Sequence, residues 1–248
     1  VFSARQMPRE LVEVLRQRAE VGGPPEETAE LQWRYATLLS EMGRFEEAIA
    51  AYQNVLQRHG EHRRALQGLA EVLSSTHRFE ELTAVMEQLA ELAENARLVG
   101  AADAPSVLTV ASHWIQAARV AFKTNDVARA VTSLRRALRA HPEHLGALDR
   151  LLQVLRKEPA SPDLEELLQR RATMEKDATR RAALELELVA LKVRRGDRAG
   201  ALVVLEAAES MGMDPFRRCP VELLLLAAHV CEQAEQWARR WLQKHATH

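Results

Sequence analysis

Residues 111–142 read ASHWIQAARVAFKTNDVARAVTSLRRALRAHP, and this stretch decides the fold. Its apolar residues recur at helical spacing in two segments, which are separated by Asn125-Asp126 and followed by Pro142. Such spacing places the apolar residues along one side of each of two α-helices, and Asn-Asp and Pro are typical of turns. The first segment carries Trp114, Ala117, Ala118 and Ala121, and the second carries Val127, Ala130, Leu134, Ala137 and Leu138. The stretch therefore predicts a helix, a tight turn and a second helix.

The same outline occurs twice more upstream, with a period of about 34 residues. In the first of these copies the turn falls at Gly43, and in the second it falls at His77. The first copy carries Leu31, Tyr35, Leu38, Leu39, Phe45, Ala48, Ile49, Tyr52, Val55 and Leu56, and the second carries Leu66, Leu69, Ala70, Leu73, Phe79, Leu82, Val85, Met86 and Leu89. A repeat of this length indicates helix pairs that bury their apolar faces against one another.

These residues resemble the tetratricopeptide repeat, a family in which apolar, small and turn residues hold fixed positions in each unit. Three positions depart from the pattern: Gln32 stands where a bulky residue is usual, His77 where Gly is usual and Leu82 where Ala is usual. The resemblance implies an all-α fold, an α-solenoid that forms a right-handed superhelix of antiparallel helix pairs with terminal capping helices. Counted from Ala111, the family residue types match at Trp114, Ala117, Ala118, Ala121, Asn125, Val127, Ala130, Leu134, Ala137 and Pro142.

The chain is expected to be a single solenoid over residues 1–248. An offset of 153 residues superposes Leu11–Val55 on Leu164–Ala208 without a gap, so two stretches are built alike. Because Leu11–Ala19 matches a second helix, we expect the chain to begin within a repeat, like a slice of a longer bacterial array. An insertion around residues 97–110 predicts lengthened helices and a loop, which leaves open a division into residues 8–98 and 106–248 at loop 99–105. Helices at 221–231 and 233–245, the latter with Trp237 and Trp241, are expected to cap the end.

Charge and composition exclude several classes of function. Only 4% of residues are aromatic, which favours helix over strand, and the net charge of −1 provides no field for nucleic acid or an acidic membrane. The charge is uneven, because residues 1–103 sum to −6 and residues 104–157 sum to +6. No apolar run approaches the ~20 residues that span a bilayer. Cys219 and Cys231 are too far apart in one helix for a disulfide, which favours a cytoplasmic location and leaves a periplasmic one open.

Neither an active site nor a metal or cofactor site is expected. The pairs His59/His62 and His141/His144 have a spacing that can bind metal, but both lie at turns between units and lack a third ligand. No phosphate-binding glycine loop, zinc-protease motif or nucleophile elbow occurs, so we expect no enzyme. Several Arg pairs fall at positions expected to face solvent and have no aromatic residues for base stacking, which argues against RNA.

The resemblance also implies where a partner would bind. In tetratricopeptide folds the first helix of each pair lines the concave face, chiefly through positions 2, 5, 9, 12 and 13. Along this groove we expect first acidic and aromatic side chains, then a basic centre and then an apolar stretch. Some tetratricopeptide proteins bind acidic chaperone tails with a clamp of Lys, Arg and Asn side chains, and this sequence lacks those residues at the clamp positions. The partner-binding residues expected on this basis are Trp33, Thr37, Gln67, Glu71, Ile115, Arg119, Phe122, Lys123, Asp149, Gln153, Arg156, Lys157, Leu186, Ala190 and Val193.

The sequence thus predicts a non-catalytic scaffold that recruits or positions a partner protein, with no nucleic acid and no integral membrane contact. An amphipathic segment with acidic residues would suit the groove, and a segment or a small domain such as a small GTPase is a candidate partner. At the level of the family, bacterial proteins of this kind serve motility, pilus or envelope assembly. The alternative is a structural subunit that self-associates or caps a larger complex.

Overall fold

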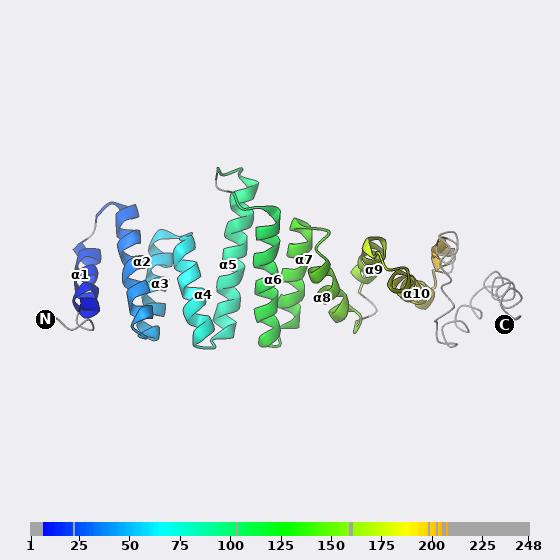
Figure 1. The fold of residues 1–248 in the computed structure, drawn as a ribbon, viewed down its shortest axis with the longest axis horizontal. Helices are drawn as coiled ribbons and strands as arrows, with labels where there is room; N and C mark the ends of the chain where they lie inside the picture. The colour runs from blue at the N-terminus through cyan, green and yellow to red at the C-terminus, as the bar shows by residue number, and fades with distance from the viewer. Residues whose placement is uncertain are drawn as a thin grey trace, which may run out of the picture. The chain divides into compact units, whose positions relative to one another are not determined.

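The computed structural model describes residues 7–207, except 22, 103, 159–160, 198, 202 and 205–206. All regular structure in this part of the chain is helical, as the sequence predicts (Figure 1). The helices are α1 (Met7–Val21), α2 (Pro25–Glu41), α3 (Phe45–His59), α4 (Arg63–Ser75), α5 (Phe79–Leu98), α6 (Val107–Lys123), α7 (Val127–Ala140), α8 (Leu145–Leu155), α9 (Asp163–Met174) and α10 (Ala178–Arg194). None of them is both long and apolar enough to cross a membrane.

The helices form the predicted antiparallel pairs. α2 packs on α3, α4 on α5 and α6 on α7, and each of α3 and α5 also packs on the first helix of the following pair. α1 packs on α2 in the place of a second helix, as the internal match predicts. The contacts within the chain group it into two compact units, Val1–His144 and Leu145–His248, and so draw a boundary different from loop 99–105. The predicted capping helices lie outside the described residues.

A left-handed residue ends α2, α4 and α6, the first helices of three pairs, and also follows α10. Its φ is +73° at Gly43, +59° at His77, +58° at Asn125 and +80° at Gly196. The residue that follows donates its backbone N–H to the carbonyl five positions earlier, which satisfies a carbonyl that the helix end leaves free. These bonds run from Arg44 to Leu39 (2.9 Å), Arg78 to Leu73 (3.0 Å), Asp126 to Ala121 (3.0 Å) and Asp197 to Lys192 (2.9 Å). His77 therefore forms the same turn as the other units, although the family usually has Gly at this position.

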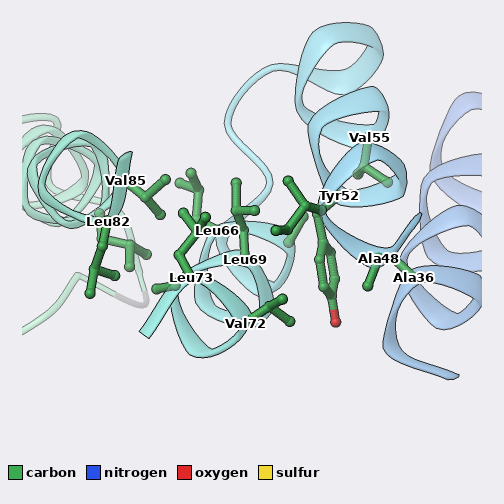
Figure 2. Close-up of a cluster of buried hydrophobic side chains, with 14 of the residues drawn as sticks. Ala36, Ala48, Tyr52, Val55, Leu66, Leu69, Val72, Leu73, Leu82 and Val85 are labelled. Atoms are coloured by element: carbon green, nitrogen blue, oxygen red, sulfur yellow. The ribbon is translucent and has the colours of Figure 1, made fainter. Parts of the chain in front are cut away.

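Small residues set the distance between paired helices in the core of the first unit (Figure 2). Ala36 of α2 and Ala48 of α3 are both fully buried, so the two backbones approach closely. Leu66, Leu69 and Leu73 of α4 then meet Leu82 and Val85 of α5 in the same cluster. The core thus runs without a break from one pair to the next, and each pair depends on its neighbour for burial.

Tyr52 of α3 contacts both α2 and α4 in this core. Its ring extends from α3 and is buried, and its hydroxyl donates a hydrogen bond to Oγ1 of Thr37 on α2 (3.1 Å). Burial raises the pKa of Tyr52, so the phenol keeps its proton at neutral pH. On α4 the ring passes Gly68, where an added Cβ would lie 2.5 Å from Cζ and Oη of Tyr52. Position 68 must therefore lack a side chain for the ring to reach Thr37.

The insertion takes the form of a longer α5 and a loop. α5 has 20 residues, against 15 in α3, whereas α6 with 17 residues is as long as α2. In Figure 1 the end of α5 and its loop project past the neighbouring helices. α5 and α6 pack along each other below the loop, and Ala117 and Val120 of α6 belong to the same core cluster as α4 and α5. Loop 99–105 therefore lies within the first unit.

We predict that His77→Gly stabilises the chain by about 0.5–1 kcal/mol. A left-handed conformation costs a residue with a Cβ about 1–2 kcal/mol, and the greater backbone freedom of glycine in the unfolded chain offsets about half of that. The midpoint of urea unfolding, followed by circular dichroism, should rise. Gly43→Ala places a Cβ at the equivalent turn and should lower the midpoint; a fall with His77→Gly would contradict the account of the turn.

We also predict that Gly68→Ala lowers the free energy of unfolding by about 1–3 kcal/mol, because the new methyl group meets the ring of Tyr52. The loss should shrink in a Tyr52→Leu background, where no ring lies beside position 68. Urea unfolding of the four chains measures this coupling. Gln67→Ala, at the exposed adjacent position, is the matched control. Equal losses in both backgrounds would show that Tyr52 is not the obstacle.

Candidate partner-binding face

α2 and α4 share an exposed cluster of one aromatic and three charged side chains. Arg64 of α4 donates from Nη1 to Glu30 of α2 (3.2 Å), and its guanidinium lies over the ring of Trp33, 5.3 Å from the centroid. Glu30 also accepts from Arg34 (3.0 Å). The side chain of Arg64 is 63% exposed, so this contact is a weak one that orients Trp33 at the surface. The sequence-predicted residue Trp33 is thus half-buried and accessible to a partner.

Thr37 has a structural role beside its expected one. Its hydroxyl donates to the carbonyl of Trp33 (3.0 Å) and accepts from Tyr52. Because both hydrogen-bonding directions are used inside the protein, Thr37 offers a partner mainly its methyl group. Gln67 and Glu71, the predicted residues of α4, are exposed.

α6 carries two cations of the face and two apolar side chains. Arg119 and Lys123 are exposed, whereas Ile115 and Phe122 are half-buried. The ammonium of Lys123 lies 4.5 Å from the centroid of the Phe79 ring, at the start of α5. We call the residues Trp33, Thr37, Gln67, Glu71, Ile115, Arg119, Phe122 and Lys123, all on α2, α4 and α6, the first-helix face.

The positive charge of the middle segment is partly neutralised within the first unit. Arg129 of α7 donates from Nε and Nη2 to Glu87 of α5 (2.9 and 2.6 Å), and Arg136 pairs with Glu91 (2.8 Å). The acidic α5 and the basic α7 thus meet. Arg119 and Lys123, by contrast, form no salt bridge with another described residue, so part of the positive charge that stays unpaired lies on α6.

Burial keeps two histidines of the first unit neutral. It lowers the pKa of His113 on α6, and the nearby Arg63 lowers it further. It also lowers the pKa of His62, whose Nδ1 accepts the backbone N–H of Ala65 and so begins α4. Neither ring adds positive charge at neutral pH.

In the second unit the expected charges are largely paired. Arg156 donates from Nε and Nη2 to Glu187 of α10 (both 2.7 Å), and Asp149 accepts from Arg171 of α9 (2.7 Å). Gln153 and Lys157 are exposed. Leu186, Ala190 and Val193 are half-buried along α10. Because Glu187 neutralises Arg156, this unit offers less positive charge than the sequence predicts.

Sequence reasoning missed the contacts between successive first helices. Glu30 and Arg64 lie one repeat apart, at position 2 of their units, and Arg156 and Glu187 stand at nearly the same separation. For Glu30 and Arg64, the opposite charges at the same position of adjacent units were the available signal. The repeat pattern also gives no role to Gly68, whereas in the structure this position leaves room for the ring of Tyr52.

No group of three or more His, Cys, Asp or Glu side chains with the arrangement of a metal site occurs in the part of the chain that the structure describes. The rings of His141 and His144 stack edge to face, 5.8 Å apart. Cys219 and Cys231 lie outside the described residues, as do Trp237 and Trp241.

The pairs match known repeats. Models of the tetratricopeptide repeat match residues 39–102 and 115–163. One chain in the structure of Naa15/Naa10 bound to HypK-THB shares the fold: it is 16% identical with a TM-score of 0.51, and the match covers 98% of this chain and 38% of that one. YrrB, described as a TPR protein with an unusual peptide-binding site, is 17% identical with a TM-score of 0.40, over 88% of this chain and 97% of its own.

A crystal structure of MamA is 16% identical with a TM-score of 0.40, and the match covers 79% of this chain and 98% of that one. No curated protein matches the sequence. The two matched segments contain the turns at Gly43, His77 and Asn125 and the helix pairs described above. The chain is therefore a tetratricopeptide repeat protein.

Proposed function

We propose that the chain recruits a partner protein by holding a segment of it against the first-helix face. Tetratricopeptide repeats are protein–protein interaction scaffolds, and this general role applies to the chain. The observation that carries the finer proposal is that Arg119 and Lys123 are exposed on α6 and form no salt bridge with other described residues, while Arg129 and Arg136 of the same basic segment are paired with α5.

The chemistry of the face defines the segment. Trp33, Ile115 and Phe122 provide half-buried apolar surface, and Arg119 and Lys123 provide charge beside it. An amphipathic segment with carboxylates near one end complements this pattern. The face lies on helices that pack into one core, so its side chains are held in place before binding and little entropy is lost when a segment docks.

The proposed role is non-catalytic and needs no cofactor. Following the bacterial arrays that the sequence resembles, we extend the proposal to assembly of motility, pilus or envelope structures, with a small domain such as a small GTPase among the candidate partners. Leu186, Ala190 and Val193 of α10, with Gln153 and Lys157, form a second accessible surface in the second unit. We assign them to partner contact as well.

Self-association is the competing role. A monomer whose sedimentation coefficient does not change with concentration supports recruitment. A stable oligomer that survives high salt supports the structural alternative.

We predict that Arg119→Glu with Lys123→Glu weakens capture of the partner at least about tenfold. Each lost attraction of an exposed charge contributes up to ~1 kcal/mol, reversal adds repulsion, and 1.4 kcal/mol corresponds to a factor of ten. Quantitative affinity capture from native lysate measures the loss, and circular dichroism should show unchanged helix content.

Arg18→Glu with Arg58→Glu is the matched control, because it makes the same change of charge at exposed positions of α1 and α3. Capture by this variant should equal that of the original chain. Equal losses of capture in both variants would show that only the net charge of the chain matters. Unaltered capture by the α6 variant would refute binding at the first-helix face.

A further inference from the structure

The end of the α5–α6 extension exposes large apolar side chains. Val99 and Leu98 are 79% and 78% exposed, which are the highest values among the large apolar residues that the structure describes. Leu108, in the first turn of α6, is 60% exposed. Scattered apolar residues are common on protein surfaces, but three on one helix hairpin form a patch, and such patches mark interaction sites. We call Leu98, Val99 and Leu108 the apolar rim.

One residue of the rim, Leu98, lines a pocket of about 640 Å³, and the chain neighbours of Val99 and Leu108 line it as well. Leu98 from α5 and Val107 and Val110 from α6 give the pocket apolar walls, and Val110 is buried. Ala101 and Ala104 of the loop and Ala140 of α7 add only methyl groups. The pocket exists because the chain carries small residues where α5, the loop and α7 come together. Its volume lies in the range of binding pockets for ligands and side chains.

Two arginines give the pocket a positive edge. Arg97 of α5 and Arg139 of α7 line it and are exposed, and neither is in a salt bridge with another described residue. The one acidic residue of the lining, Glu94, lies 4.0 Å from Arg136, which also pairs with Glu91. The negative charge nearby is thus engaged by a third arginine, and the guanidinium groups of Arg97 and Arg139 are open to an added carboxylate.

We propose that this pocket and its rim bind an acidic segment of another protein, in which leucine-like side chains alternate with carboxylates. The apolar side chains would enter the pocket and cover the rim, and the carboxylates would pair with Arg97 and Arg139. This surface is separate from the first-helix face, because it is formed by the last turns of α5, the first turn of α6 and the end of α7.

The positive edge argues against a second copy of the chain as the occupant. A symmetric dimer through this patch would place Arg97 and Arg139 of both copies at the same contact, where like charges repel. The pocket argues against a membrane surface, since a concave site walled by three segments matches a protruding side chain better than a flat bilayer.

A labelled peptide tests the proposal. Fluorescence anisotropy of fluorescein-EDLLEDILEE is measured against the full chain at low and at high ionic strength. Two control peptides accompany it, one with lysine in place of every acidic residue and one with serine in place of every leucine and isoleucine. The acidic apolar peptide should bind at least about tenfold more tightly than either control, and the affinity should fall as salt rises.

Variants locate the site. Arg97→Glu with Arg139→Glu, and separately Leu98→Ser with Leu108→Ser, should each weaken binding of this peptide at least about tenfold. All four side chains are exposed, so circular dichroism should show an unchanged fold. Arg119→Glu with Lys123→Glu, which alters the first-helix face, should leave the affinity for the peptide as it is. The peptide experiment tests the pocket and lysate capture tests the first-helix face, so a negative result for one proposal is distinguishable from a negative result for the other.

Three results would overturn the inference. The first is equal binding of the acidic apolar peptide and its controls, or binding that neither pair of substitutions weakens. The second is a concentration-dependent dimer in sedimentation that Leu98→Ser with Leu108→Ser dissociates, which would make a second copy the occupant. The third is absence of peptide binding together with co-sedimentation of the chain with phosphatidylserine vesicles that the same substitutions abolish.

Discussion

The left-handed turn at the end of the first helix is the constraint on which the pairs α2–α3, α4–α5 and α6–α7 depend. At Gly43, His77, Asn125 and Gly196 the chain takes the same backbone conformation, and the next residue closes the same hydrogen bond to the helix it leaves. This bond fixes where the first helix stops and how the second helix begins. The apolar stripes of the two helices can then meet, with fully buried Ala36 and Ala48 at the closest approach in the first pair.

The sequence was sufficient for the helix pairs, because helical spacing and turn residues are local signals. The positions of α2, α4 and α6 and the longer α5 follow from it directly. Contacts between units could be predicted less well. The pairing of Arg156 with Glu187 and the path of Tyr52 past Gly68 depend on how far one helix stands from the next, and periodicity does not specify that distance. The accessibility of Arg119 and Lys123 followed from the repeat pattern, whereas the hydrogen bonds of Thr37 did not.

Part of the uneven charge of the sequence is used in salt bridges between helices of the same unit. An acidic front beside a basic middle predicts attraction to an outside partner, but part of that charge joins α5 to α7 through Glu87, Glu91, Arg129 and Arg136. The arginines and lysine that remain without a salt bridge are therefore more informative than the sum over the segment. Among them are Arg119 and Lys123 near the end of α6 and Arg97 and Arg139 around the pocket.

The length of α6 separates two surfaces of one unit. Val107 and Lys123 mark its two ends, and at 1.5 Å per residue these lie about 24 Å apart. A partner with two short motifs joined by a flexible linker that spans this distance would engage the second surface at a millimolar effective concentration. Two contacts that are each weak would then add up to a tight complex. The chain would thus select partners by the distance between their two motifs, which must match the length of α6.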